Sequence, residues 1–159
     1  MQPAAAEAPH IVLDTNAVLD CWLFEDPAAQ ALRRAVEAGR LRWLATAPML
    51  AEFTHVLARP IGLRWEPQRE RLLSANQLHS LPAIVAPAAA RSPGGLRCSD
   101  PDDQKFLDTA LHERVRWLVT RDRALLKLRR RAMALGLTIV EPAHCAVTIG
   151  ELAEPRPAP

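Results

Sequence analysis

Two separate apolar runs of this 159-residue chain each end close to an aspartate, and these two carboxylates are the best indication of its chemistry. The run at residues 11–13 is followed by Asp14, and the run at residues 115–120 by Arg121 and Asp122. A short run of β-branched and large apolar residues that stops at a small polar residue is typical of a buried strand in a parallel sheet. Ligands of such sheets bind outside the carboxyl ends of the strands, so Asp14 and Asp122 are predicted to share one acidic site.

A third carboxylate, Asp103, is selected by helix phase. At about 100° per residue, the helix predicted at residues 101–112 has one apolar stripe. The stripe consists of Phe106, Leu107, Ala110 and Leu111. Asp103 falls close to the centre of this stripe, where an unpaired charge is costly to bury and the helix dipole offsets part of the cost. An alternative stays open, in which Asp103 is only an N-terminal capping acid with some solvent access.

Glu52 is a weaker fourth candidate, at the border of an apolar helical stripe, because a border Glu usually extends to water. Asp14 and Asp122 have an alternative role too, since an Asp after a strand often caps the following helix. Four carboxylates at one edge of one sheet are harder to explain as caps, because they repel one another unless protons or a metal neutralise them. A hard divalent cation with oxygen ligands, Mg²⁺ or Mn²⁺, is the natural partner.

The elements that must position these acids alternate between strands and helices. Strands are predicted at residues 10–14, 41–45, 83–85, 115–120 and 137–140. Helices are predicted in two pieces between residues 15 and 38, broken near Asp26 and Pro27, and then at residues 46–58, 66–79, 101–112 and 123–135. Apolar strands that alternate with helices indicate an α/β fold, with a parallel sheet and helices on both faces.

A chain of this length is expected to form one domain, which we place at residues 10–150. The Pro- and Ala-rich segments at residues 1–9 and 151–159 are expected to be flexible tails. No apolar stretch approaches the roughly 20 residues of a membrane helix. The first residues also lack the basic start and apolar core of a signal peptide, so we expect a cytoplasmic protein without a membrane partner.

Composition excludes some site types and leaves others open. Cys21, Cys98 and Cys145 are far apart, which argues against a disulfide framework or a structural zinc site. The five histidines are scattered without a pair at ligand spacing. The net charge of +2 does not by itself imply nucleic acid. A denser basic cluster at residues 121–131 could contact phosphates, or could be a solvated helix face that caps carbonyls.

Taken in order, these segments resemble a PIN domain. The segments are VLDTN at residues 12–16, LAEF at 50–53, DPDD at 100–103, FLDTA at 106–110 and LVTRD at 118–122. Each motif is short, but the ordered set is specific and spans roughly residues 10–142. The set is especially similar to the bacterial PIN subgroup that supplies the toxins of toxin–antitoxin pairs.

The resemblance implies a three-layer α/β/α fold with a central parallel sheet. It also implies a metal-dependent endoribonuclease that hydrolyses the phosphodiester bonds of single-stranded RNA with Mg²⁺ or Mn²⁺. The acidic quartet of the family, which holds the metal and carries catalysis, falls on Asp14, Glu52, Asp103 and Asp122. The accessory polar positions fall on Asn16, Thr120, Asp100 and Asp102.

The resemblance also carries expectations about partners. Arg121 stands where relatives often have glycine, and a long cation there could bind a phosphate or hinder access. Arg121 and Arg123 are expected to hold the RNA backbone. A small antitoxin protein is an expected partner, and a homodimer is a further expectation. Residues 64–86 could offer an apolar surface for such contacts, although core packing also explains their composition.

Other functions begin from a similar first strand. A phosphatase of the haloacid dehalogenase type needs a second Asp two residues after the first, where this chain has Asn16. A response-regulator receiver needs adjacent acids after the first strand, whereas Asp14 stands alone. A catalytically silent PIN-like module that binds RNA or a protein partner is the main alternative to a nuclease, and the retention of all four acids argues against it.

Overall fold

The computed structural model describes residues 7–90 and 93–148, and these residues include a five-stranded sheet. The strands are β1 (His10–Leu13), β2 (Arg42–Ala45), β3 (Ala83–Ile84), β4 (Trp117–Val119) and β5 (Thr138–Val140). They lie in the order β3-β2-β1-β4-β5, and every neighbouring pair is parallel. The prediction of an α/β fold with a central parallel sheet is confirmed.

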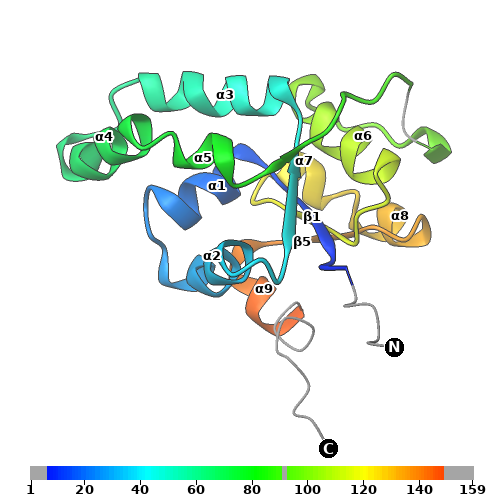
Figure 1. Ribbon diagram of the computed structural model, residues 1–159. Coiled ribbons are helices and arrows are strands. Elements are labelled where there is room, and N and C mark those ends of the chain that lie inside the picture. The colour runs from blue at the N-terminus through cyan, green and yellow to red at the C-terminus, as the bar shows by residue number, and fades with distance from the viewer. Residues whose placement is uncertain (1–6, 91–92, 149–159) are drawn as a thin grey trace, which may run out of the picture.

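Helices cover both faces of the sheet, which gives the three-layer α/β/α architecture (Figure 1). The α-helices are α1 (Thr15–Trp22), α2 (Gln30–Glu37), α3 (Ala47–Ala58), α4 (Glu66–Ser74), α5 (Gln77–Ser80), α6 (Gln104–His112), α7 (Arg123–Leu126), α8 (Arg129–Ala134) and α9 (Pro142–Thr148). Short 3₁₀ turns are η1 (Pro27–Ala29), η2 (Leu63–Trp65), η3 (Pro93–Gly95) and η4 (Pro101–Asp103). In Figure 1, α1 and α2 lie on one side of the sheet, and α6 and α8 lie on the other.

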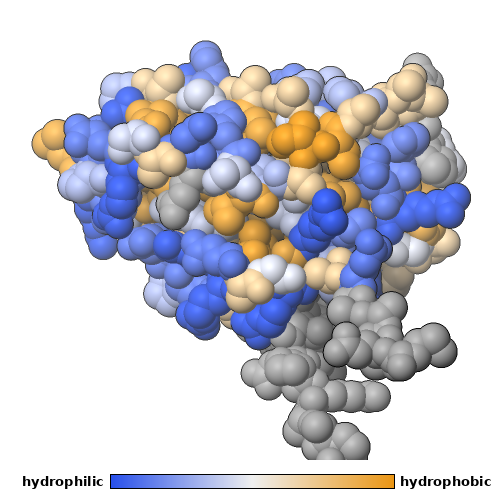
Figure 2. Space-filling model, viewed as in Figure 1, coloured by the Kyte–Doolittle hydropathy of each residue, from blue (hydrophilic) through white to orange (hydrophobic). Residues whose placement is uncertain are grey.

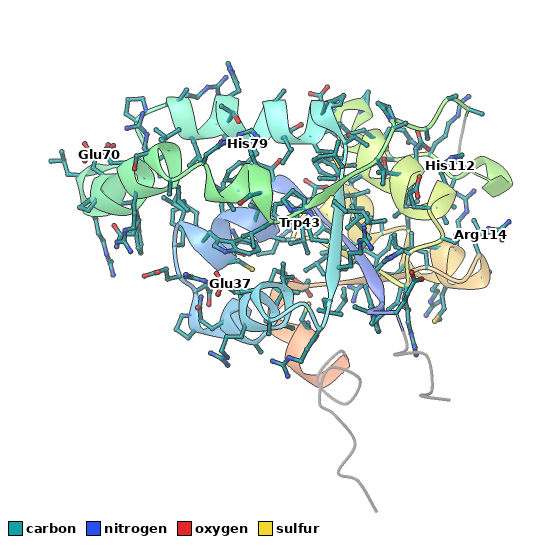
Figure 3. All side chains as sticks on the ribbon, in the orientation of Figure 1. Glu37, Trp43, Glu70, His79, His112 and Arg114 are labelled. Atoms are coloured by element: carbon teal, nitrogen blue, oxygen red, sulfur yellow. The ribbon has the colours of Figure 1, made fainter. Side chains whose placement is uncertain are left out.

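The central strands are apolar because helices cover them on both faces. The side chains of Ile11, Val12 and Leu13 in β1 are all buried. On the α2 side of the sheet, Trp22 stacks on Trp43 with 5.5 Å between ring centroids. Figure 3 places Trp43 in the interior of the molecule. This packing fixes the strands that carry the candidate acids.

Some predicted boundaries are confirmed and others are wrong. The break before α2 occurs where expected, and Asp26 Oδ1 accepts from the backbone N–H of Ala28 at 2.9 Å. The helix predicted at residues 66–79 is divided into α4 and α5, because Asn76 has a φ of 48°, which a right-handed helix cannot contain. The helix predicted at residues 123–135 is likewise divided into α7 and α8. Helix α9 was not predicted.

The segment before β1 is partly described. The carbonyl of Pro9 accepts a hydrogen bond from the backbone N–H of Arg42 at 3.0 Å, so the chain is paired one residue before the predicted domain begins. Residues 1–6 and 149–159, which include the expected C-terminal tail, lie outside the described residues. The limits of the domain therefore stay a prediction.

Cys21, Cys98 and Cys145 are free thiols, and burial raises the pKa of the Cys145 thiol to about 12.

Within the described part of the chain, no helix is both long and apolar enough to cross a membrane. Figure 2 shows a largely hydrophilic face with apolar side chains gathered near the segment after α5, where Ile84 is 54% exposed.

Candidate active site

The carboxyl ends of β1 and β4 bring the first two acids together. Leu13 and Val119 are partners in the parallel register, and the backbone N–H of Asp14 donates to the carbonyl of Val119 at 3.0 Å. The next residue of β4 is Thr120, whose hydroxyl donates to Asp14 Oδ2 and accepts from the backbone N–H of Asp122 at 2.9 Å. One buried hydroxyl therefore joins Asp14 to the start of the Asp122 loop, and the accessory role of Thr120 stays a prediction.

Both strand-end acids are also helix caps. Asp14 Oδ1 accepts from the backbone N–H of Ala17 at 2.9 Å, and Asp122 Oδ1 accepts from Ala124 at 2.6 Å. The capping alternative is thus confirmed for both residues, but it does not compete with a site. A cap takes up one oxygen of each carboxylate and fixes its orientation, and the second oxygen of Asp14 accepts from the Thr120 hydroxyl.

Asp103 is the third member of the cluster. It precedes α6 but makes no capping hydrogen bond, so the alternative of a simple capping acid is wrong. Its Oδ2 is buried and has no hydrogen-bond partner within the described residues, and Asp122 is one of the neighbouring acids that raise its pKa.

Burial and neighbouring acids raise the pKa values of Asp103 and Asp14. Burial, followed by the charges of Asp122, Asp100 and Asp14, raises the pKa of Asp103 to about 7. Burial is also the largest cause that raises the pKa of Asp14 to about 6, while the Thr120 and Ala17 hydrogen bonds oppose the rise. Charged carboxylates here need a compensating cation. We call Asp14, Asp103 and Asp122 the aspartate cluster.

Glu52 does not join the aspartate cluster in this structure. Its Oε1 accepts from the Thr15 hydroxyl at 2.6 Å, and its Oε2 forms an ion pair with Lys105 of α6. The two elements that carry Asp14 and Asp103 therefore also carry the partners of Glu52. Whether Glu52 acts as a metal ligand stays a prediction.

The accessory acids lie around the turn before α6. Asp100 caps η4 through a 2.9 Å bond to the backbone N–H of Asp102 and contributes to the raised pKa of Asp103. Asp102 is exposed, and its carbonyl accepts from Lys105 at 2.6 Å. Asn16 is exposed in the first turn of α1, two residues after Asp14. Of these groups, Asp100 acts on the cluster through its charge, and the accessory roles of Asn16 and Asp102 stay predictions.

A hard cation fits the aspartate cluster. Within the described residues, no three His, Cys, Asp or Glu side chains converge in an arrangement that could hold a metal. Mg²⁺, however, is commonly held by only one or two carboxylates, together with waters and the phosphate oxygens of a substrate. The buried, unpartnered Oδ2 of Asp103 and the raised pKa of its carboxyl group are features that such a cation would resolve.

Arg121 has a partner that the sequence analysis missed. Its Nε lies 2.9 Å from Oδ2 of the buried Asp20, a charge contact without hydrogen-bond alignment. Burial raises the pKa of Asp20, and the Arg121 guanidinium opposes the rise. The sequence did mark Asp20 as unusual, because it interrupts an otherwise apolar run of α1. Its partner lies on another element, and no local sequence pattern identifies such a partner.

The basic cluster shows the carbonyl-capping role, and its contact with phosphates stays a prediction. Arg129 Nε donates to the carbonyl of Leu126 at 3.2 Å, which is the carbonyl-capping role. Arg123, next to Asp122, is exposed and makes no side-chain hydrogen bond or ion pair to any described residue. Arg123 is therefore available at the rim, whereas Arg121 is tied to Asp20.

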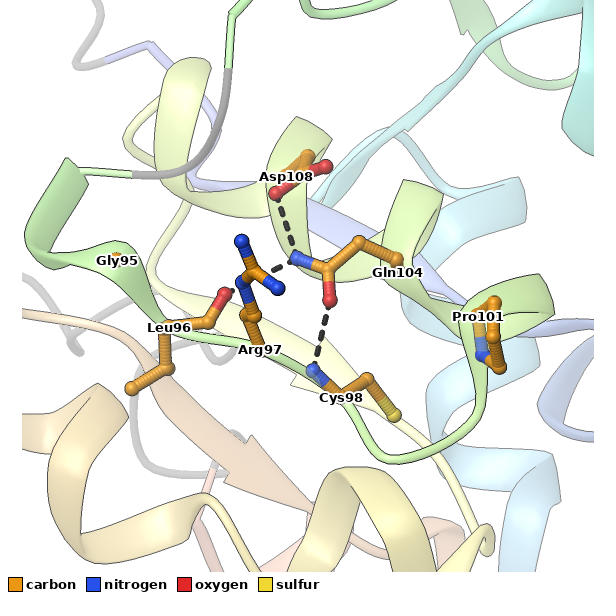
Figure 4. Close-up of a pocket in the computed structure, with 7 residues that line it drawn as sticks. All are labelled: Gly95, Leu96, Arg97, Cys98, Pro101, Gln104 and Asp108. Atoms are coloured by element: carbon orange, nitrogen blue, oxygen red, sulfur yellow. Dashed lines mark hydrogen bonds between the residues drawn. The ribbon is translucent and has the colours of Figure 1, made fainter.

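A cavity of about 580 Å³ lies beside the site (Figure 4). It is lined by Gly95, Leu96, Arg97, Cys98, Pro101, Gln104 and Asp108. The Gln104 amide fixes the wall by accepting from the Cys98 backbone N–H at 2.7 Å and donating to the Leu96 carbonyl at 3.1 Å. The cavity adjoins the aspartate cluster, because the charge of Asp103 contributes to the raised pKa of Cys98.

The histidines are separate from the site. Figure 3 shows His79 and His112 on different parts of the molecule. His79 Nε2 lies 3.3 Å from the Thr54 hydroxyl, and His55 Nε2 lies 2.9 Å from Arg59. These contacts are structural, as the sequence analysis expected.

Fold and site together define a three-layer α/β/α protein with an acidic centre at the carboxyl edge of its sheet. A family model described as PIN domain matches residues 10–124, which is more than half of the chain. The chain belongs to the PIN domain family. PIN domains are generally nucleases and typically use divalent metal ions, so the carboxyl edge is the candidate active site. Among curated proteins, none matches this chain.

The raised pKa of Asp103 predicts how stability depends on pH in the absence of metal. The folded protein holds this proton up to about pH 7, while the unfolded chain releases it near 3.8, so wild-type stability should fall as the pH rises through this window. Asp103→Asn removes this loss, and its advantage should grow to about 1–3 kcal/mol at pH 7.5, allowing for partial exposure.

Urea unfolding in EDTA at several pH values measures this effect. Glu70→Gln on the exposed face of α4, at the periphery in Figure 3, is the matched acid-to-amide control and should be neutral. An Asp103→Asn protein that is less stable than wild type at every pH would contradict the electrostatic account.

The Asp20–Arg121 contact predicts a coupling between two residues far apart in sequence. Arg121→Gln should cost about 1–3 kcal/mol of unfolding free energy, because it leaves the buried Asp20 without its cation. The Asp20→Asn/Arg121→Gln double variant should recover most of this loss. Arg123→Gln is the control, with an expected change within about 0.5 kcal/mol. Strictly additive effects in this double-mutant cycle would show that the Asp20–Arg121 contact contributes nothing to the free energy of unfolding.

Proposed function

We propose that this PIN domain protein is a metal-dependent endoribonuclease that hydrolyses phosphodiester bonds in single-stranded RNA. The observation that carries the proposal is the aspartate cluster. The charged groups that raise the pKa of Asp103 most, Asp122, Asp100 and Asp14, are all acids, and its buried Oδ2 has no hydrogen-bond partner within the described residues. A site built in this way favours a bound cation, and a divalent cation is a cofactor that can support phosphodiester hydrolysis.

Asp14, Asp103 and Asp122 would hold Mg²⁺ or Mn²⁺. When bound, such an ion supplies an activated water and stabilises the charge that develops on the phosphoryl oxygens and the leaving group. Asp103, whose pKa is raised to about 7, would give up its proton when it binds the cation. Thr120 keeps Asp14 in position through its hydroxyl, and the two helix caps keep Asp14 and Asp122 from rotating. Hydrolysis consumes one water, breaks one backbone P–O bond and returns a proton to the departing oxygen.

The preference for RNA is supported by the basic side chains at the rim and by the family resemblance. Arg123 is exposed beside Asp122, and the Arg121 side chain is 50% exposed even with Asp20 as its partner. Both guanidinium groups could contact backbone phosphates on either side of the cleaved bond. A single strand can bend to follow the carboxyl edge of the sheet. The two backbones of a duplex are instead held at a fixed spacing by the helix geometry.

The biological setting of the proposal is a toxin–antitoxin pair, in which this chain is the toxin. A small antitoxin protein would block the acidic edge, and the toxin would self-associate. Exposed apolar side chains between α3 and β3 support a protein contact there, since Leu63 is 93% exposed and Ile84 is 54% exposed. An exposed apolar patch on a small domain commonly marks an interaction site.

Cleavage of end-labelled single-stranded RNA with Mn²⁺ tests the proposed activity. Wild type should cleave, EDTA should abolish cleavage, and Asp14→Asn or Asp103→Asn should lower the rate by about 10²-fold or more, because a metal ligand contributes several kcal/mol to the transition state. Glu70→Gln should cleave like wild type. If RNA binds but wild type and Asp14→Asn cleave equally little, the protein is a silent RNA-binding module and the nuclease proposal is wrong.

A further inference from the structure

The fourth acid of the family pattern, Glu52, is used differently from the three aspartates. Both of its carboxylate oxygens have partners, Thr15 on Oε1 and Lys105 on Oε2. Its charge is already neutralised by the Lys105 ammonium, whereas the groups that act on Asp103 are all acids. A carboxylate whose charge is already balanced by an ammonium gains less from a metal ion than an acid that is surrounded by other acids.

Lys105 is held at a defined point by three contacts. Its Nζ donates to Glu52 and to the carbonyl of Asp102, and it lies 5.0 Å from the centroid of the Phe106 ring. An ammonium has three N–H donors, and protein oxygens in the described part of the chain accept two of them. The side chain is 28% exposed, so the third donor has access to a ligand.

Hydrogen bonds link this ammonium to the segments that carry the aspartate cluster. Thr15, which contacts Glu52, directly follows Asp14, and Lys105 lies two residues after Asp103 at the start of α6. Glu52 on α3 thus joins the two segments that carry Asp14 and Asp103. The basic residues of this chain are almost all arginines, yet a lysine occupies this position. Its compact ammonium suits a confined point contact with one phosphate oxygen better than a planar guanidinium does.

We propose that Lys105 binds a non-bridging oxygen of the substrate phosphodiester and that Glu52 is a positioning residue for Lys105 rather than a metal ligand. This inference rests on the proposed nuclease function and specifies how the same site holds its substrate. Lys105 takes no part in proton transfer. It supplies a fixed positive charge on the side of the phosphate away from the aspartate cluster, and Glu52 keeps that charge in place.

Metal binding without RNA separates the two roles of the acids. Titration calorimetry with Mn²⁺ should give Glu52→Gln an affinity within about threefold of wild type, whereas Asp103→Asn should lose about tenfold or more. Glu52→Gln should at the same time lower kcat, because Lys105 is no longer held. A loss of Mn²⁺ affinity in Glu52→Gln as large as that in Asp103→Asn would overturn the assignment.

Salt dependence of RNA binding tests the phosphate contact independently of cleavage. In an Asp14→Asn background, binding of a short oligouridine should have a log Kd against log salt slope that Lys105→Met reduces by about 0.7, the value for one phosphate contact on a single strand. Lys105→Arg should keep most of the slope. Arg71→Met should leave the slope unchanged. This control removes one exposed charge on α4, which lies at the opposite end of the molecule from α6 in Figure 1.

A double variant is the control for loss of folding in the single variants. The Glu52→Gln/Lys105→Met protein removes both charges and keeps the side-chain volumes, and it should fold, bind Mn²⁺ and show the reduced slope. An unchanged slope in both Lys105 variants would overturn the phosphate contact. Absence of RNA cleavage by wild type would instead overturn the proposed function, and the Mn²⁺ and salt measurements would still decide the roles of Glu52 and Lys105.

Discussion

The parallel pairing of β1 with β4 is the constraint on which the site depends. This register puts Leu13 opposite Val119, and the next residues, Asp14 and Thr120, therefore meet where the strands end. The Thr120 hydroxyl then bonds to both Asp14 and the backbone of Asp122, so a single side chain sets the spacing of two acids. A slip of one residue would turn every side chain of a strand to the opposite face, and the buried apolar core forbids it.

Placing three carboxylates at this edge works against the stability of the metal-free protein. Burial and mutual repulsion raise the pKa values of Asp14 and Asp103 to about 6 and about 7, so near neutral pH the cluster keeps protons that isolated carboxyl groups would release. A cation that binds only the folded state removes this cost by mass action. The same feature that weakens the metal-free protein would therefore favour the proposed metal binding, and this links the electrostatics of the fold to its proposed chemistry.

The sequence was informative where local patterns carry the information. Strand-end position identified Asp14 and Asp122, and helix phase identified Asp103, because both depend on periodicities of the backbone. The Glu52–Lys105 ion pair joins residues 53 positions apart, and the Asp20–Arg121 contact joins α1 to the loop after β4. Such contacts depend on how elements pack, which no local pattern records. The break at Asn76 was missed for a similar reason, since its left-handed backbone is compatible with a continuous helical pattern in the neighbouring residues.

The central claim is that Asp14, Asp103 and Asp122 hold a divalent cation, and anomalous difference density from a crystal soaked in saturating Mn²⁺ tests it most directly. The account predicts a peak within the aspartate cluster that contacts Asp103, while Glu52 remains against Lys105. A cluster without density at saturating Mn²⁺, with its three side chains splayed apart, would contradict the account.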